Sequence, residues 1–215
     1  MLGTHSFATG ALFREVSTYF PLTGTRRVQR VRGTPNKDMI MGSAFHETLA
    51  NILVRAKRLV YTYGVDHLCD ILKGLQEPAE AIVEKRKCDL STEDYVELVR
   101  RVNAVHGFET ARLATRIQEA VAKQPYIRED SLVSTAIPVM VEQRLDGSFL
   151  GLSQMLSVDA FVLPEPMIMD LKYGEPRKFH RLGTTGYALV MESLYEYPVN
   201  LGCIVYLTFT GDRIT

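Results

Sequence analysis

The chain has 215 residues, of which 46% are hydrophobic and 23% are charged, and its 25 Lys and Arg balance 25 Asp and Glu. The net charge therefore gives no sign of a nucleic-acid partner, although a local basic patch is compatible with this balance. No apolar run approaches the roughly 20 residues that cross a bilayer, and the start lacks the features of a secretory signal. We expect a cytoplasmic protein.

Three cysteines, Cys69, Cys88 and Cys203, are widely spaced and contain no CxxC pair. An odd number without a close pair argues against a disulfide scaffold and against a self-contained zinc site. We expect three separate thiols.

The first part of the chain predicts helices. Residues 1–20 have apolar residues at helical spacing, and residues 21–38 are polar and basic, typical of a connector or a surface strand. The strongest helix is predicted over 43–63, where apolar residues recur every three or four positions and Gly64 follows as a cap. Further helices are expected over three ranges, namely 66–74, 77–87 and 92–123, the last with a candidate break near Gly107.

The second part predicts a sheet. Strands are expected over 133–142, 155–163 and 167–173, with an Asp146-Gly147 turn that favours a hairpin between the first two. A helix over 177–194 and a final strand over 201–210 follow. The order predicts an α/β fold, residues 1–215 forming one domain with a helical lobe at about 66–124 inserted between the first core helix and the sheet.

Two of the predicted strands carry charged residues among apolar neighbours. Asp159 lies in one of them. Asp170 lies in the next, 11 residues after Asp159, and Lys172 lies in the same strand as Asp170. Acids in buried strands cost several kcal/mol unless they are paired or bind a metal. Asp170 and Lys172 project from the same face, and an antiparallel neighbour would bring Asp159 beside them. Two close carboxylates favour a hard cation, Mg²⁺ or Mn²⁺.

Each of these residues also has a plainer interpretation. Asp170 and Lys172 are compatible with a structural ion pair, and Asp159 with a strand end or a turn contact. His46, at the edge of the apolar stripe of its helix, taken alone is typical of a core histidine. The joint pattern favours a functional site.

That pattern resembles the PD-(D/E)xK nuclease superfamily, in its RecB-like branch. The corresponding elements read Gly42-Ser43-Ala44-Phe45-His46, Val158-Asp159, Asp170-Leu171-Lys172, and Arg181-Leu182-Gly183-Thr184-Thr185-Gly186-Tyr187. The CRISPR-associated Cas-four nucleases are the most similar group, and within it the archaeal subtype I-A branch, Csa-one, whose final helix resembles residues 180–189. The resemblance covers about residues 40–62 and 150–210.

The resemblance implies a restriction-endonuclease-like mixed sheet flanked by helices, and a role for each matching residue. His46, Asp159, Asp170 and the carbonyl of Leu171 would hold Mg²⁺ or Mn²⁺. Lys172 would orient the attacking water or neutralise developing charge, and Tyr187 would position the substrate backbone. A basic cluster is a candidate phosphate track, although a solvated loop is an equal alternative; its members are Arg26, Arg27, Arg30 and Arg32.

Two departures from the family pattern are visible. The final helix of RecB-like nucleases carries glutamine four residues before its tyrosine, where this chain has Gly183. The Cas-four family also carries four cysteines for an iron–sulfur cluster, one of them before the histidine motif. No cysteine precedes His46, and only Cys203 follows the tyrosine helix, so the cysteine pattern of the cluster is not present in this chain.

The resemblance implies a metal-dependent DNA exonuclease of a CRISPR adaptation system, which processes DNA ends for spacer acquisition. Its expected partners are DNA, single-stranded or end-frayed, and the Cas-one and Cas-two integrase proteins. One alternative is a catalytically weak or silent scaffold subunit that binds DNA or the integrase. Another is a metalloenzyme that does not act on nucleic acids, on an unrelated α/β fold.

Overall fold

The computed structural model describes residues 36–78, 80–162, 166–207 and 213–214. The helix predicted over 1–20 and the basic cluster Arg26–Arg32 lie outside the described residues. The elements in chain order are α3 (Lys37–Tyr63), η1 (Val65–His67), α4 (Leu68–Leu75), α5 (Glu80–Glu84), η2 (Lys87–Asp89), α6 (Thr92–Lys123), α7 (Glu129–Ala136), β1 (Val139–Leu145), η3 (Ser148–Leu150), β2 (Leu156–Val162), β3 (Met167–Tyr173), α8 (His180–Tyr195), β4 (Leu201–Leu207) and β5 (Arg213–Ile214).

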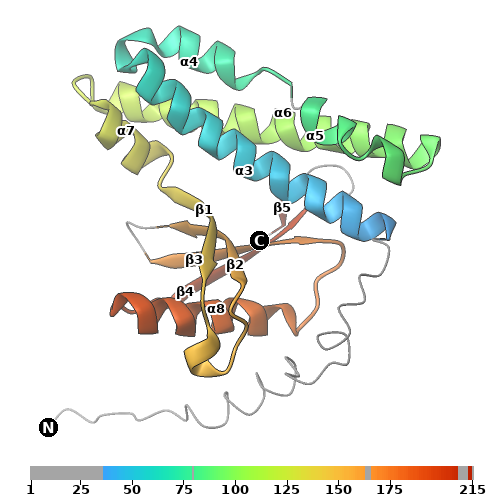
Figure 1. Cartoon of the computed structure of the whole chain (residues 1–215). Coiled ribbons are helices and arrows are strands. Elements are labelled where there is room, and N and C mark those ends of the chain that lie inside the picture. The colour runs from blue at the N-terminus through green and yellow to red at the C-terminus, as the bar shows by residue number, and fades with distance from the viewer. Residues whose placement is uncertain (1–35, 79, 163–165, 208–212, 215) are drawn as a thin grey trace, which may run out of the picture.

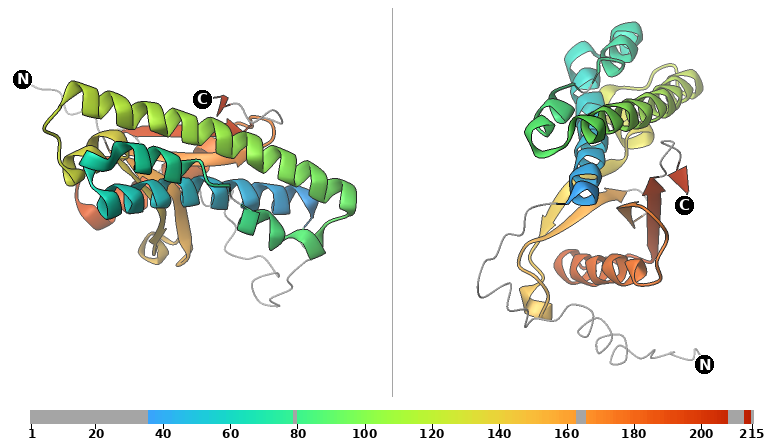
Figure 2. Two further views of the ribbon diagram at one scale, coloured as in Figure 1. Left: turned by 90° about the horizontal axis from the view of Figure 1, so that it is seen from above. Right: turned by 90° about the vertical axis from the view of Figure 1, so that its right-hand side faces the viewer.

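These elements form three layers (Figure 1). The helices α4, α5 and α6 lie outermost on one side, α3 lies between them and the sheet, and α8 covers the other face of the sheet (Figure 2). The structure is therefore a mixed α/β arrangement. No helix of the described part of the chain is both long and apolar enough to span a bilayer.

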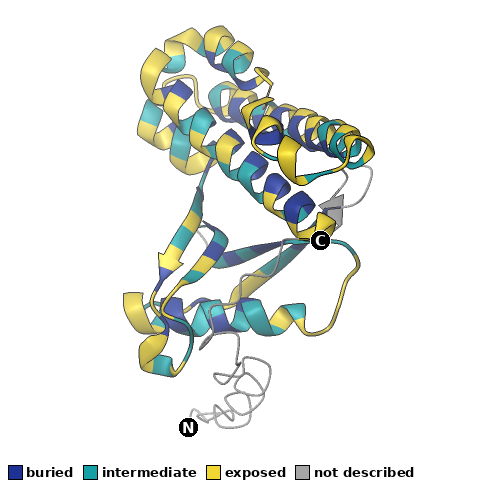
Figure 3. Cartoon of the chain, turned by 45° about the vertical axis from the view of Figure 1, so that its right-hand side comes forward, coloured by how far each residue is buried: buried dark blue, intermediate teal, exposed yellow. Residues whose placement is uncertain are grey.

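The central helix α3 begins six residues earlier than predicted. The side chain of Asn36 accepts a hydrogen bond from the amide of Met39 at 2.9 Å, which caps the first turn before Gly42 is reached. The helix ends at Gly64, whose φ of 76° is a conformation that favours glycine. Its buried face contacts the other helices and the sheet (Figure 3), which makes α3 the element that joins both layers.

Helix α6 runs without a break through Gly107. The side chain of Ser91 caps it by accepting a hydrogen bond from the amide of Asp94 at 3.2 Å. Its apolar stripe packs against α3 and is buried, at Leu98, Val102, Val105, Leu113, Ile117 and Ala120. Because this stripe continues on both sides of Gly107, tertiary packing outweighs the low helix propensity of glycine there.

The strand predicted to start at Val133 was wrong in its first part. Residues 129–136 form α7, in which Leu132 and Ala136 are buried one turn apart. Pro138 disfavours the helical conformation of Ile137, so the chain becomes extended there and β1 begins at Val139. The strand then extends to Leu145, three residues beyond the predicted end.

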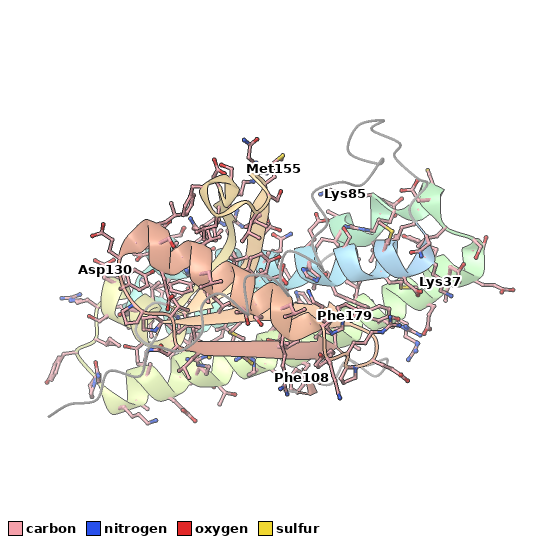
Figure 4. All side chains as sticks on the ribbon, turned by 90° about the horizontal axis from the view of Figure 1, so that it is seen from below. Lys37, Lys85, Phe108, Asp130, Met155 and Phe179 are labelled. Carbon is pink, nitrogen blue, oxygen red and sulfur yellow. The ribbon has the colours of Figure 1, made fainter. Side chains whose placement is uncertain are left out.

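The sheet has the order β1-β2-β3-β4-β5, with β3 in the centre. β1 with β2, β2 with β3, and β4 with β5 are antiparallel, whereas β3 and β4 are parallel. The predicted hairpin between β1 and β2 is confirmed, but its connection contains η3, so Asp146-Gly147 is only its first part. Met155 lies at the end of this connection, and Phe179 lies beside the first turn of α8 (Figure 4).

The pairing of β2 with β3 is short, and this positions the candidate site. The last registered pair is Ala160 with Met169, and the ladder ends there. Asp159 and Asp170 are the next residues on the two strands. Both acids therefore lie in strands, as predicted, and they lie at the point where the two strands separate.

Candidate active site

Asp159 and Asp170 meet where β2 parts from β3. The Oδ2 atom of Asp159 accepts a hydrogen bond from the backbone amide of Leu171 at 2.8 Å. A side chain therefore replaces the strand partner that β2 no longer provides at this position, which satisfies an otherwise buried amide. It is the amide of Leu171 that contacts Asp159; the predicted metal contact would use the carbonyl of the same residue.

His46 reaches the same carboxylate from α3. Its Nδ1 atom lies 3.1 Å from Oδ1 of Asp159, and the two side chains are 34% and 17% exposed. Burial alone would lower the pKa of His46, but the hydrogen bond to Asp159 and its negative charge raise it above its usual value. Burial would raise the pKa of Asp159, but His46, the Leu171 amide and the charge of Lys172 hold it below its usual value.

Asp170 and Lys172 form the second half of the cluster. Nζ of Lys172 lies 2.7 Å from Oδ2 of Asp170, whose side chain is only 2% exposed. Burial and the neighbouring charge of Asp159 raise the pKa of Asp170, and Lys172 offsets only part of this increase. Although Lys172 is close, the buried Oδ2 atom accepts no hydrogen bond of good geometry from the described residues.

Tyr187 approaches the two acids from α8, on the opposite side of the sheet from His46. Burial, and then the charges of Asp170 and Asp159, raise the pKa of Tyr187 to about 12. The hydroxyl therefore keeps its proton at neutral pH and is available as a donor next to the acids. A Cβ at Gly183, one turn earlier, would meet no described atom within 4 Å apart from its chain neighbours and the backbone of its own helix.

The donor set suits a hard divalent cation in its chemistry. Two carboxylates, one of them with a buried oxygen that lacks a good hydrogen bond, lie beside an imidazole, and Mg²⁺ and Mn²⁺ prefer oxygen ligands. Within the described ranges, however, no three His, Cys, Asp or Glu side chains are arranged to hold a metal ion. His46 is turned toward Asp159, and Lys172 toward Asp170, so metal binding requires these contacts to rearrange.

A cavity of about 210 Å³ lies next to His46 and Asp159, and two of its lining residues were missed by the sequence reasoning. Nε and one terminal nitrogen of Arg112 donate to Oε2 of Glu109 at 3.0 and 2.8 Å. Glu109 is a buried acid that continues the apolar stripe of α6 between Val105 and Leu113. That position, four residues from the apolar neighbour on either side, is the signal that could have identified it.

The cysteines do not form a ligand cluster. Cys69 and Cys88 are exposed free thiols, and Cys203 on β4 is half-buried and free. An iron–sulfur cluster of the family type needs four cysteine ligands, so the residues of this chain do not fit one by themselves.

The chain is similar to known proteins over most of its length. The family model for the CRISPR-associated exonuclease Csa1 matches residues 23–214. A protein from Saccharolobus solfataricus, named CRISPR-associated exonuclease Csa1, is 33% identical over 199 residues, which cover 87% of this chain and 62% of that protein. A protein of the same name from Thermoproteus tenax is 24% identical over 181 residues, which cover 84% of this chain and 56% of that protein.

The chain therefore spans less than two thirds of the length of either relative. No solved structure matches. Since the family model covers nearly all of the sequence, the chain belongs to the CRISPR-associated exonuclease Csa1 family.

Proposed function

We propose that the chain is a divalent-metal-dependent DNA exonuclease with a RecB-like fold, which trims DNA ends during CRISPR spacer acquisition. The observation that carries this proposal is the convergence of Asp159, Asp170 and Lys172 where β2 and β3 separate, with His46 against Asp159. Burying acids reduces stability unless partners or a metal offset the cost, so acids in these strands favour a functional role. The names of the relatives supply the exonuclease activity and the CRISPR association.

The proposed domain organisation places the whole chain in one nuclease domain. The central strand β3 carries Asp170 and Lys172, as the acid-x-lysine strand of RecB-like nucleases does. The helices within 66–124 would then be a lobe that packs on α3 (Figure 1), and its helix α6 also contacts the sheet next to Asp159.

Asp159, Asp170, His46 and the Leu171 carbonyl would hold Mg²⁺ or Mn²⁺, which supplies Lewis-acid stabilisation of the phosphate and lowers the pKa of a water molecule. Lys172 would place its ammonium beside the attacking water and offset negative charge that develops in the transition state. The protonated hydroxyl of Tyr187 would donate to a phosphate oxygen and so hold the DNA backbone in place. The cluster would thus combine charge stabilisation with positioning of the scissile phosphate.

A basic groove beside α8 is a candidate path for the DNA backbone. It is lined by Arg177, Lys178 and Arg181 together with residues of β4 such as Tyr206. The hydroxyl of Tyr206 lies 3.0 Å from Nδ1 of His180, and the positive charge of Lys172 contributes to lowering the pKa of His180 after burial. Tyr206 is the registered partner of Lys172 on β3, so the groove adjoins the proposed catalytic lysine. Cations along it would neutralise successive phosphates.

A second candidate function is a catalytically silent subunit that binds DNA or the Cas-one and Cas-two integrase. Gly183 favours it, because the glutamine of active relatives of this superfamily would occupy that position. The deciding experiment incubates end-labelled single- and double-stranded DNA with the protein and Mn²⁺, Mg²⁺ or chelator, with Asp170→Asn as the matched variant. Cleavage that requires the metal and Asp170 supports the nuclease, and DNA binding without cleavage under every metal supports the silent subunit.

A further inference from the structure

The cavity next to His46 and Asp159 takes no part in the metal binding and phosphate positioning proposed for this site. Its volume of about 210 Å³ is several times the roughly 30 Å³ that one water molecule occupies in the liquid. It lies between α3, α6 and strands β1, β2 and β3. Most of its lining is apolar, with Leu49, Ala50, Leu53, Leu113, Val141 and Met169 among its walls. An apolar cavity that shares a wall with candidate reacting groups has the character of a site that binds part of a substrate.

One polar wall of this cavity is formed by an arginine that a carboxylate holds in place. The Glu109 side chain is 4% exposed and the Arg112 side chain is 33% exposed. The carboxylate is therefore buried, whereas the guanidinium that it binds is partly accessible to solvent. Two hydrogen bonds from the guanidinium to Oε2 of Glu109 restrict its orientation. A planar guanidinium stacks readily on flat aromatic groups, including nucleobases.

The rim of the cavity carries a backbone distortion opposite Asp159. Glu142 on β1 has φ of 51°, which is uncommon for a residue with a side chain. The registered pairs of β1 and β2 are Val141 with Ala160 and Gln143 with Val158, so the pair between Glu142 and Asp159 is missing. Strain of this kind persists where the surrounding structure enforces it, and it occurs often at functional sites.

We propose that this cavity receives the base of the terminal nucleotide of the DNA strand, with Arg112 stacked against it and the scissile phosphate at Asp159 and Asp170. The proposal rests on the proposed nuclease function and names the part of the substrate that the site recognises. A terminal base has a stacking neighbour on one side only, so removing it from the stack costs less than flipping an internal base. The apolar walls would bury its ring, and the phosphate would follow beside His46 and Asp159, which line the cavity.

The inference is tested by binding in the presence of chelator, which separates recognition from cleavage. Single-stranded DNA carries the fluorescent base 2-aminopurine either at its end or at an internal position, and a third DNA lacks the terminal base. The parent protein should change the fluorescence of the terminal label much more than that of the internal one. It should bind the DNA without a terminal base about tenfold more weakly, as expected when one stacked base is lost.

Ala50→Phe fills the cavity from α3, and Ala104→Phe adds the same ring on the exposed face of α6. Ala50→Phe should abolish both the terminal signal and the preference for an intact end, whereas Ala104→Phe should leave both unchanged. If Ala50→Phe fails to fold, the double variant Glu109→Gln with Arg112→Gln removes the stacking cation without leaving a buried single charge, and it should lose most of the same preference.

Three results overturn the inference. A parent that cuts DNA but binds intact and baseless ends equally has no base pocket, although the nuclease proposal stands. A folded Ala50→Phe that keeps the terminal signal places the base elsewhere. A parent that neither binds nor cuts DNA with Mn²⁺ removes the nuclease proposal and this inference together.

Discussion

Nδ1 of His46 lies 3.1 Å from Oδ1 of Asp159, although 113 residues separate them in the sequence. The contact joins α3 to β2 across the point where the sheet ladder ends. Each partner shifts the pKa of the other toward the charged state, and burial opposes this for both. The helix and the sheet are therefore connected at the residues on which the proposed chemistry depends.

The first prediction concerns metal binding. Asp159→Ala and Asp170→Ala should each abolish the binding of Mn²⁺ measured by calorimetry, because each removes a carboxylate that would contact the ion directly. Asp146→Ala is the control, since Asp146 is exposed in the β1–β2 connection and caps Ser148. Binding of equal strength in all three variants would show that the acids are structural.

The second prediction separates catalysis from binding at Lys172. Lys172→Ala should lower the cleavage rate by about two orders of magnitude or more, because it removes one preorganised charge from the transition state. The affinity for DNA should change little, since one lysine among several phosphate contacts carries a small share of binding. Lys172→Arg should not restore the rate, because the planar guanidinium does not replace a compact ammonium. An alanine variant as fast as the parent would make Lys172 a partner of Asp170 only.

The sequence predicted the elements that carry the site because their patterns are strong. The period of α3 and the acids within β2 and β3 depend only on the spacing of neighbouring residues. The start of β1 was mispredicted because Leu132 and Val133 suit a strand as well as a helix, and only Pro138 indicates the boundary. Short apolar runs of this kind do not distinguish the two states.

The contact of His46 with Asp159 and the cavity beside it depend on how distant elements pack, which no local pattern encodes. The resemblance to a family placed His46 and both acids in one site, but it gave no contact between them. Glu109 and Arg112 were missed because an acid and an arginine three residues apart on a long helix are typical of a solvated surface. Only the alignment of Glu109 with the buried stripe of α6 distinguishes it.

The third prediction concerns Gly183 on α8. A Cβ at this position would meet no described atom within 4 Å apart from its chain neighbours and the backbone of its own helix, so a side chain can start there without a clash. The variant should raise the free energy of unfolding by about 0.5 kcal/mol, since glycine is a poor helix former. It should also increase the cleavage rate if the missing glutamine limits activity.

Gly107→Gln is the matched control, because Gly107 lies within α6 and a Cβ there also meets nothing within 4 Å. It should give the same gain in stability, measured by chemical denaturation, without a change in rate. An equal increase in cleavage rate in both variants would show that the increase comes from higher stability and not from the glutamine introduced at position 183.

The last prediction uses His106, a buried histidine on α6 that lies outside the proposed catalytic cluster. Burial, and then the positive charge of Arg55, lower the pKa of His106 below its usual value of about 6.5. Below pH 6.5 the unfolded chain therefore binds a proton that the folded chain binds only at lower pH. The contribution of His106 to stability is complete above pH 6.5 and decreases as the pH falls from 6.5 toward the pKa of the folded state.

Chemical denaturation at pH 7.5 and 5.5 measures this decrease in the parent and in His106→Gln, whose amide does not titrate. The free energy of unfolding of the parent should fall more between the two pH values than that of His106→Gln, whatever the stability of the variant at pH 7.5. The other charged groups are the same in the parent and in His106→Gln, so the difference between the two proteins isolates the effect of His106. An identical change in the free energy of unfolding for the parent and His106→Gln would mean that His106 takes up its proton as easily in the folded chain as in the unfolded one. That result would contradict the effect expected from the burial of its side chain.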